Sequence, residues 1–120
     1  MTKKILIVED DANAALLMEE LLSPNFEVVK APDGLTAIEK ANQTPFDLIL
    51  MDLRLPMFSG LWFCRAFKKK PNTRHIPIVV VSAALDEEAE EQARELGVAA
   101  TLKKPFQNRE FLDTVNRHVV

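Results

Sequence analysis

The chain has 120 residues, of which 48% are hydrophobic and 28% charged, with only three glycines and a net charge of -3. These values are typical of one soluble globular domain and argue against disordered, fibrous and strongly basic nucleic-acid-binding proteins. No apolar run approaches the roughly 20 residues that cross a bilayer, and the apolar N-terminal run is too short for a signal peptide, so we expect a cytoplasmic domain with no membrane partner.

Five short apolar runs alternate with five longer amphipathic segments along the chain. The short runs predict buried β-strands at residues 4–8, 27–31, 48–51, 78–81 and 100–103. Apolar residues at three- and four-residue spacing predict helices over residues 13–22, 35–41, 61–69, 87–96 and 108–119. This alternation predicts an α/β fold over residues 1–120 as one domain, with a doubly wound parallel sheet, right-handed crossovers and helices on both faces.

Candidate site residues follow the predicted strands, because ligands of doubly wound sheets bind at the carboxyl ends of the strands. These residues are Glu9, Asp10, Asp11, Asp52, Ser82, Lys103 and Lys104. Asp10, Asp11 and Asp52 follow strands that we expect to be neighbours, and at about 4 Å two carboxylates repel by about 4 kcal/mol at an effective dielectric constant near 20. Either a raised pKa or a bound cation has to relieve this repulsion, and hard oxygen ligands that leave room for water suit Mg²⁺.

With a cation in place, Asp52 is the candidate nucleophile toward a phosphorus atom, and the product is an aspartyl phosphate. Lys104 is suited to neutralising phosphoryl oxygens, and the Ser82 hydroxyl to hydrogen bonding one of them. Each residue also has a simpler interpretation: Asp10 or Asp11 as a helix cap, Ser82 as a hydroxyl bonded to backbone, and Lys104 as a solvated lysine. Their gathering at one edge of the sheet favours the phosphoryl site.

The chain resembles the response regulator receiver domains, similar to chemotaxis regulators, from end to end. The matching motifs are IVEDD at 7–11, DG at 33–34, DLILMDLRLP at 47–56 followed by Gly60, PI at 77–78, SA at 82–83, GVA at 97–99 and KKPF at 103–106. The resemblance implies a flavodoxin-like sheet with the strand order 2-1-3-4-5. It also implies a role in two-component phosphorelay signalling, as a switch and not as an enzyme.

The same resemblance assigns roles to the strand-end residues. It implies Asp52 as the phosphoacceptor, Ser82 and Lys104 as phosphate ligands, and a cis peptide bond between Lys104 and Pro105. The implied ligands of Mg²⁺ are Asp10, Asp11, Asp52 and the backbone carbonyl of Arg54. The implied donor is a sensor histidine kinase or a histidine phosphotransfer protein, and the implied output surface, on the fourth helix, fifth strand and fifth helix, would bind an output protein or form a homodimer.

One position departs from the family pattern. The family usually has Tyr or Phe three residues before the Lys-Pro pair, where this chain has Thr101, and the chain has no tyrosine. The usual aromatic relay is therefore missing, so any output has to rest on the loop after Ser82, the fifth strand and backbone shifts. Arg54 and Ala84 occupy positions that tune phosphoryl lifetime in the family, and we hypothesise that Arg54 alters the access of water or a partner to the phosphoryl group.

Aromatic residues in and before the third helix suggest a second surface. Phe63 and Phe67, four residues apart, predict the buried stripe of this helix. Trp62 then points elsewhere, either to pack over the helix edge or to join Phe58 in an exposed patch that docks a partner. The acidic start of the fourth helix complements the helix dipole and is most simply a solvated face, with a basic partner as the alternative.

Three other functions fit parts of the pattern. An aspartate-nucleophile phosphatase usually has a second acid two residues after the nucleophile, where this chain has Arg54. A flavin-binding protein shares the sheet topology, but the acids at residues 9–11 would repel its phosphate. A degenerate receiver that binds partners without phosphorylation stays open because of Thr101, although the complete set of acids with Ser82 and Lys104 argues against it.

Overall fold

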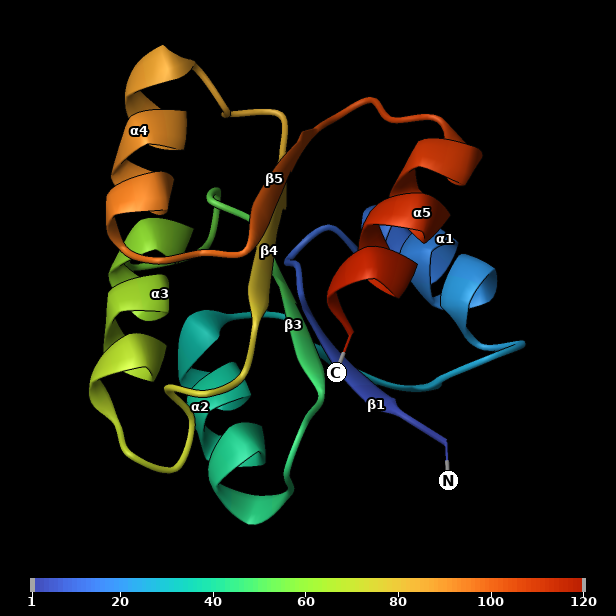
Figure 1. Cartoon of the computed structure of the whole chain (residues 1–120), viewed down its shortest axis with the longest axis horizontal. Helices are drawn as coiled ribbons and strands as arrows, with labels where there is room; N and C mark the ends of the chain where they lie inside the picture. The colour runs from blue at the N-terminus through green and yellow to red at the C-terminus, as the bar shows by residue number, and fades with distance from the viewer. Residues whose placement is uncertain (1, 120) are drawn as a thin grey trace.

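The computed structural model describes residues 2–119 and has five strands and five helices alternating along the chain (Figure 1). The strands are β1 (Lys4–Val8), β2 (Glu27–Ala31), β3 (Leu48–Met51), β4 (Ile78–Ser82) and β5 (Ala100–Lys103). The helices are α1 (Ala12–Leu22), α2 (Gly34–Gln43), α3 (Gly60–Lys69), α4 (Glu87–Glu95) and α5 (Asn108–His118). The predicted α/β alternation is therefore confirmed.

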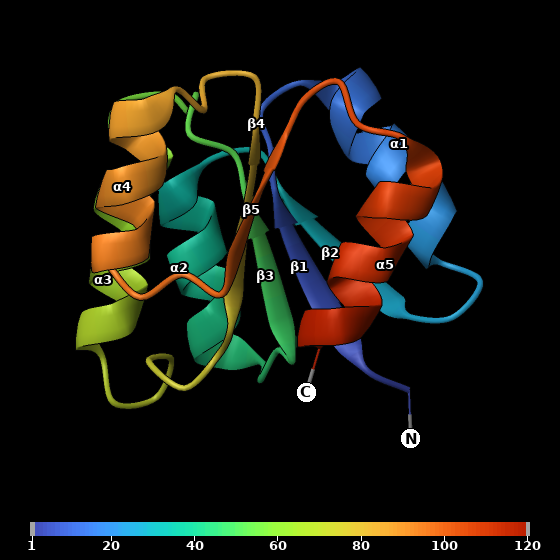
Figure 2. The same cartoon turned by 45° about the horizontal axis from the view of Figure 1, so that its top comes forward.

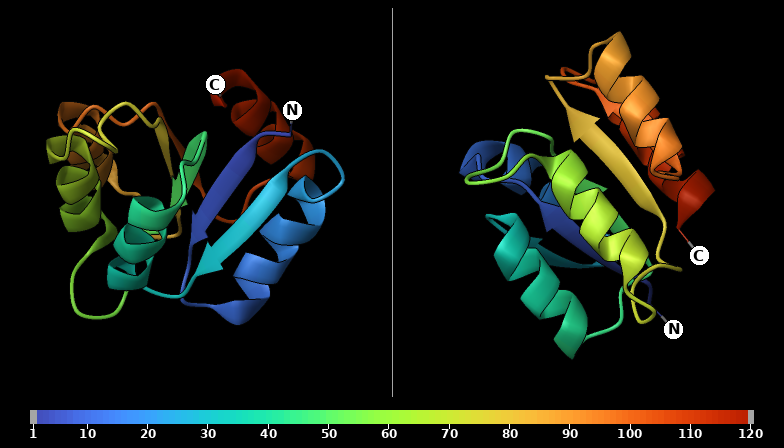
Figure 3. Two further views of the ribbon diagram at one scale, coloured as in Figure 1. Left: turned by 90° about the horizontal axis from the view of Figure 1, so that it is seen from below. Right: turned by 90° about the vertical axis from the view of Figure 1, so that its left-hand side faces the viewer.

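The five strands form one parallel sheet in the order β2-β1-β3-β4-β5, as the family resemblance implied. Figure 3 shows β1 and β2 side by side and running in the same direction. The helices α1 and α5 cover one face of the sheet, and α2, α3 and α4 cover the other (Figures 1 and 2). Residues 2–119 include no helix with the length and apolar character of a membrane span.

Local capping explains why three helices begin one residue before their predicted starts. The side chains of Asp11, Asp33 and Ser59 occupy the N-cap positions of α1, α2 and α3 and accept hydrogen bonds from backbone N–H groups of the first turn. An N-cap oxygen satisfies a donor that has no partner inside the helix, which fixes where the helix starts. Apolar periodicity locates the middle of a helix well but does not locate this cap.

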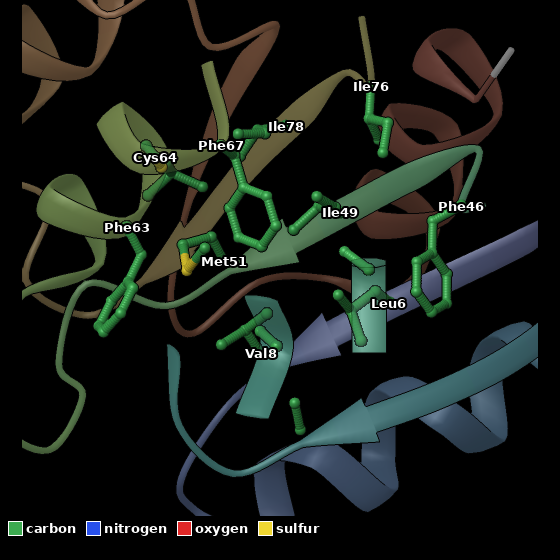
Figure 4. Close-up of a cluster of buried hydrophobic side chains, with 14 of the residues drawn as sticks. Leu6, Val8, Phe46, Ile49, Met51, Phe63, Cys64, Phe67, Ile76 and Ile78 are labelled. Atoms are coloured by element: carbon green, nitrogen blue, oxygen red, sulfur yellow. The ribbon is translucent and has the colours of Figure 1, made fainter. Parts of the chain in front are cut away.

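Alternate residues of the strands build a separate core on each face. The core under α2, α3 and α4 includes Leu6, Val8, Ile49, Met51, Ile78 and Val80, with Phe63 and Phe67 packed on them (Figure 4). The core under α1 and α5 takes the intervening strand residues together with Phe111. Burial of each large apolar side chain contributes about 1.5–3 kcal/mol, so both faces fix the register of the strands.

The β1–β3 register and a close backbone contact place the end of β3 accurately. Val8 pairs with Met51, and the N–H of Asp52 donates to the Val8 carbonyl at 3.0 Å. At the start of α3, a Cβ atom on Gly60 would lie 2.1 Å from the carbonyl oxygen of Asp52. Only glycine permits this approach, so the α3 N-terminus packs directly against the backbone of Asp52.

Candidate functional site

Polar side chains from four strand ends meet at the carboxyl edge of the sheet, which is the upper edge in Figure 2. Glu9 follows β1, Asp52 follows β3, Ser82 ends β4 and Lys104 follows β5. Asp52 is only 6% exposed and Glu9 only 3%, and Ser82 is fully buried. Buried polar groups need partners, so the hydrogen bonds among these residues define the site.

Both carboxylate oxygens of Asp52 accept hydrogen bonds. Oδ1 accepts from the Ser82 hydroxyl at 2.6 Å and from the backbone N–H of Arg54 at 3.1 Å. Oδ2 accepts from Nζ of Lys104 at 3.1 Å. These contacts come from two loops and one strand, and they fix the orientation of the carboxylate. Charge-assisted bonds of this kind are about twice as strong as neutral ones, so Asp52 is held in a defined geometry.

Lys104 joins the two buried acids. Its ammonium group forms salt bridges with both Glu9 and Asp52. Burial alone would lower the pKa of Lys104, but the hydrogen bonds and charges of the two acids outweigh burial and raise that pKa. Lys104 is therefore a fixed positive charge beside Asp52, available to a second anion that approaches the same edge.

The two buried acids differ in their protonation. Burial and a hydrogen bond to Asp52 raise the pKa of Glu9 to about 7, although Lys104 acts against this rise. Burial opposes ionisation of Asp52 too, but hydrogen bonds from Glu9, Ser82 and the Arg54 amide, together with the Lys104 charge, hold its pKa below the ordinary value. Of the two acids, Glu9 therefore takes up a proton first as pH falls, and Asp52 stays ionised.

A third carboxylate completes an acidic cluster. Oxygen atoms of Glu9, Asp10 and Asp52 all lie within 4.8 Å of one another, and Asp10 is exposed. Oxygen ligands with one side open to water suit a hard cation such as Mg²⁺, which retains part of its water shell. The residues present therefore fit the metal that the sequence predicted.

One of the three carboxylates expected at the metal site lies elsewhere in the structure. Asp11 was expected beside Asp10 and Asp52, but its Oδ1 accepts from the N–H groups of Asn13 and Ala14 and caps α1. Glu9 lies beside Asp10 and Asp52 instead. Its N–H donates to the Ala31 carbonyl, so the backbone of Glu9 continues β1 into the site. The Asp11 cap was the simpler interpretation of the sequence, and the strand pattern extended by one residue would have indicated Glu9.

The loops after β4 and β5 meet behind the site. Ser82 Oγ accepts from the N–H of Ala84 at 3.1 Å, and the N–H of Lys104 donates to the Ser82 carbonyl at 3.1 Å. The peptide bond between Lys104 and Pro105 is cis, as the resemblance implied. The Ser82 hydroxyl is thus hydrogen bonded directly to the loop that leads into α4.

Thr101 connects β5 to α4 by a polar contact. Its hydroxyl donates to a carboxylate oxygen of Glu90 at 3.1 Å. The sequence alone could not reveal this pair, because Glu90 and Thr101 lie on different elements. The position that carries an aromatic residue in the family pattern therefore carries a hydrogen bond to α4 in this protein.

The aromatic residues before and within α3 divide as predicted. Phe63 and Phe67 are buried, whereas Trp62 and Phe58 are 46% and 42% exposed. The rings of Phe58 and Trp62 stack with their centroids 4.6 Å apart. Trp62 therefore joins Phe58 in an exposed aromatic pair and also packs edge-on against Phe63, and the docking of a partner on this pair stays a prediction.

Comparison with known proteins gives consistent matches over nearly the whole chain. The family model described as the response regulator receiver domain matches residues 5–116. The polar-differentiation response regulator DivK of Brucella ovis is 34% identical over 120 residues, covering 99% of this chain and 98% of DivK. The chemotaxis protein CheY4 of Vibrio cholerae superposes with a TM-score of 0.93 at 27% identity, covering 99% of this chain and 100% of CheY4.

A further solved structure is relevant to the acidic cluster. The receiver domain of the sensor histidine kinase PA1611 from Pseudomonas aeruginosa has a magnesium ion coordinated in its active site cleft. It superposes with a TM-score of 0.88 at 30% identity, covering 98% of each chain.

Proposed function

This chain belongs to the response regulator receiver domain family, and from that premise we propose that it accepts a phosphoryl group on Asp52 in a Mg²⁺-dependent reaction. The donor is a phosphohistidine of a sensor histidine kinase or of a histidine phosphotransfer protein. The observation that carries the proposal is the environment of Asp52: an ionised carboxylate held by Ser82 and Lys104 beside two further acids. We infer that residues 1–120 act as one cytoplasmic signalling domain, a switch that is not itself an enzyme.

Asp52 acts as the nucleophile. A carboxylate oxygen of Asp52 attacks phosphorus, the O–P bond forms as the P–N bond of phosphohistidine breaks, and the imidazole leaves with the electron pair and takes up a proton from water. The low pKa of Asp52 keeps this carboxylate ionised for attack. Both of its oxygens are hydrogen bonded, so at least one bond, to Ser82 or Lys104, has to be exchanged during the reaction.

Lys104 and Ser82 are the groups that receive the incoming phosphoryl oxygens. The Lys104 ammonium is a compact charge on a flexible stem, and it already lies 3.1 Å from Oδ2 of Asp52. The Ser82 hydroxyl is a donor that can turn from Oδ1 of Asp52 to a phosphoryl oxygen. Both groups stabilise the negative charge that remains after transfer, and both leave their resting positions when they do so.

Glu9, Asp10 and Asp52 are the side chains that would hold Mg²⁺, with the Arg54 carbonyl as the backbone ligand that the resemblance implies. The ion would neutralise phosphoryl oxygens and relieve repulsion among the carboxylates. Glu9 has to lose its proton to serve there, because only the ionised carboxylate binds a cation well. The expected ligand Asp11 is not retained in this set.

The response of the domain follows from the contacts of Ser82. Ser82 holds the loop before α4 through the N–H of Ala84, and α4 is linked to β5 by Glu90 and Thr101. A shift of Ser82 toward a phosphoryl group therefore pulls on α4 and alters the surface formed by α4, β5 and α5. We infer that this surface contacts the output partner.

A degenerate receiver that binds its partners without phosphorylation is the second candidate. The replacement of the family aromatic by Thr101 favours it, because the usual relay from the hydroxyl residue to the surface is missing. The retained acids, Ser82 and Lys104 favour phosphorylation.

Intact-protein mass spectrometry after incubation with acetyl phosphate and Mg²⁺ separates the two candidates. Phosphorylation predicts one added phosphoryl group that is absent from Asp52→Asn and absent when a chelator removes the metal. Asp113→Asn, an exposed acid on α5, serves as a matched control and should be labelled like the parent. No addition to the parent under any condition would favour the phosphorylation-independent module.

A further inference from the structure

An apolar pocket adjoins the site on the side of α1. It has a volume of about 320 Å³ and lies between α1 and the loop from β5 to α5, two segments that run side by side near the upper edge of the sheet in Figure 2. This volume is at the lower end of the range of about 300–1,000 Å³ that is typical of small-molecule sites. We call it the α1 pocket, and it is lined by Ala14, Leu17, Met18, Ala83, Lys104, Pro105 and Phe106.

The walls of the α1 pocket are apolar, and the wall from the β5–α5 loop is supported by the core. On α1, Leu17 is 45% exposed and leaves apolar surface in contact with water, whereas Met18 is buried. On the loop, the ring of Phe106 stacks on the buried Phe111 with the ring centroids 4.8 Å apart. A ring held against the core keeps its place, so the pocket is preformed and loses little conformational entropy when a ligand binds.

Two residues belong both to the α1 pocket and to the surroundings of Asp52. Lys104 lines the pocket, and its Nζ lies 3.1 Å from Oδ2 of Asp52. Ala83 lines the pocket too, and it directly follows Ser82, whose hydroxyl donates to Oδ1 of Asp52 at 2.6 Å. A molecule with an anionic group at Lys104 can therefore extend an apolar part into the α1 pocket.

The chemistry of the lining selects the class of ligand. Within the described chain, residues 2–119, Lys104 is the one charged residue that lines the α1 pocket. A ligand therefore needs one anionic group for Lys104 and an apolar remainder, because a second charge in the pocket would lose its water without gaining a partner. A short-chain acyl phosphate has both parts, and the Lys104 end of the pocket lies beside the carboxylate of Asp52.

We propose that the α1 pocket binds the acyl group of short-chain acyl phosphates and so makes these molecules direct phosphodonors to Asp52. The inference rests on the proposed function, because it names the small-molecule donors of that same site. In the transfer, a carboxylate oxygen of Asp52 forms the new O–P bond as the P–O bond to the acyl group breaks. The acid leaves as a carboxylate with the electron pair, so no proton is transferred.

The length of the acyl chain should control the rate of transfer. Butyryl phosphate has two methylene groups more than acetyl phosphate, and these can enter the α1 pocket. Each methylene group that is fully buried strengthens binding about fourfold. The carboxylates of the two acids have nearly equal basicity and leave with nearly equal ease. A difference between the two rates therefore reports burial of the chain in the transition state.

Phosphorylation of the full chain by acetyl phosphate and by butyryl phosphate tests the proposal, with Mg²⁺ present and each donor below saturation. Intact-protein mass gives a second-order rate constant for each donor, and the butyryl-to-acetyl ratio cancels any change in the chemistry at Asp52. We expect a ratio of about four or more in the parent. Leu17→Ser removes apolar surface, and Ala14→Leu fills the pocket with a residue of high helix propensity. Both variants should bring the ratio toward one.

Leu16→Ser is the matched control, because Leu16 is 46% exposed on α1 and does not line the pocket. Its ratio should equal that of the parent. Direct binding is measured by nuclear magnetic resonance with a phosphonate analogue of butyryl phosphate, in which a methylene group replaces the bridging oxygen. The analogue should shift the amide signals of Leu17 and Phe106 and leave those of α2 unchanged. Circular dichroism of each variant checks that it is folded.

The outcomes separate this proposal from the proposed function. Equal rate constants for the two donors in the parent, with Asp52 labelled by both, overturn the acyl site and leave the phosphoacceptor function standing. A ratio that stays high in Leu17→Ser and Ala14→Leu also overturns the acyl site, and so do analogue shifts confined to residues outside the pocket. No labelling of Asp52 by either donor overturns the phosphoacceptor function, and the acyl site with it.

Discussion

Nζ of Lys104 lies 3.1 Å from Oδ2 of Asp52 and at the same time forms a salt bridge with Glu9. One ammonium group thus contacts both buried acids at the carboxyl edge of the sheet. A divalent cation bound to these acids would share its ligands with Lys104. A bound cation and Lys104 would therefore compete for the same oxygens.

Lys104→Ala should separate metal binding from phosphoryl transfer. Removing the ammonium leaves Glu9, Asp10 and Asp52 without their positive neighbour, so Mg²⁺ should bind about tenfold more tightly. Phosphorylation of Asp52 by acetyl phosphate should nevertheless become at least about tenfold slower, because the group that neutralises the phosphoryl oxygens is gone. Calorimetric Mg²⁺ titration and the rate of mass gain measure the two effects.

Lys103→Ala is the control for this pair of measurements, because Lys103 is an exposed neighbour that makes no salt bridge among residues 2–119. Lys103→Ala should match the parent in Mg²⁺ affinity and in the rate of phosphorylation. Weaker Mg²⁺ binding by Lys104→Ala would contradict the competition between the two charges.

Glu9→Gln should remove a pH dependence of stability in the metal-free protein. Folding raises the pKa of Glu9 from 4.5 to about 7, so the protonated acid is favoured in the fold. The free energy of unfolding should therefore fall as pH rises from about 4.5 to about 7, by at most about 3 kcal/mol, and then level off. Titration of Asp52 changes the free energy of unfolding only at lower pH, because the pKa of Asp52 is depressed.

Urea unfolding with a chelator at several pH values between 5 and 8 measures this slope. Glu39→Gln, at an exposed acid of α2, should keep the slope of the parent. If the free energy of unfolding of Glu9→Gln changed with pH as steeply as that of the parent, the pH dependence would belong to another group.

Thr101→Val should uncouple α4 from β5. The substitution keeps the shape of the side chain and removes the donor of the hydrogen bond to Glu90, which contributes about 1 kcal/mol. Hydrogen exchange of α4 should rise in the unphosphorylated protein, and phosphorylation should change it less than in the parent. The double variant Thr101→Val/Glu90→Gln should add no further loss of stability, since both changes break the same bond. Additive losses would show that the two residues act separately.

Arg54→Ala should change the lifetime of the phosphoryl group. The Arg54 side chain is exposed two residues after Asp52, while its N–H holds Oδ1 of Asp52 and is retained in the variant. If the guanidinium shields the phosphoryl group from water, the variant should lose phosphate several times faster at equal extent of labelling. Arg65→Ala on α3 is the matched control. Equal dephosphorylation rates in the parent and Arg54→Ala would rule out this role.

Gly60→Ala should destabilise the protein and displace the backbone at Asp52. The added Cβ would lie 2.1 Å from the Asp52 carbonyl oxygen, so α3 or the end of β3 has to shift. We expect a loss of about 2–4 kcal/mol in the free energy of unfolding, and slower labelling of Asp52 in the fraction that stays folded. Gly97→Ala has open space around its Cβ but a φ of +83°, so it should lose only about 1 kcal/mol and label normally.

Much of the fold could be predicted from the sequence because apolar periodicity has a direct physical cause. Runs such as 48–51 are buried on both faces, and only a sheet covered by helices on both sides buries them. The strand ranges were correct, except that β4 extends one residue further, to Ser82. Helix starts were less accurate, since a cap depends on single side chains such as Asp33 and not on a repeated pattern.

The sequence by itself also determined which residue types stand at the strand ends, and so brought Asp10, Asp52, Ser82 and Lys104 to one edge before any coordinates. Only the tertiary structure decided that Glu9 and not Asp11 joins the acids, and that Thr101 bonds to Glu90. The physical reason is that sequence spacing fixes the face and edge on which a side chain lies. Which atoms meet across two elements depends on register, loop conformation and the competition of each side chain for nearby backbone N–H groups.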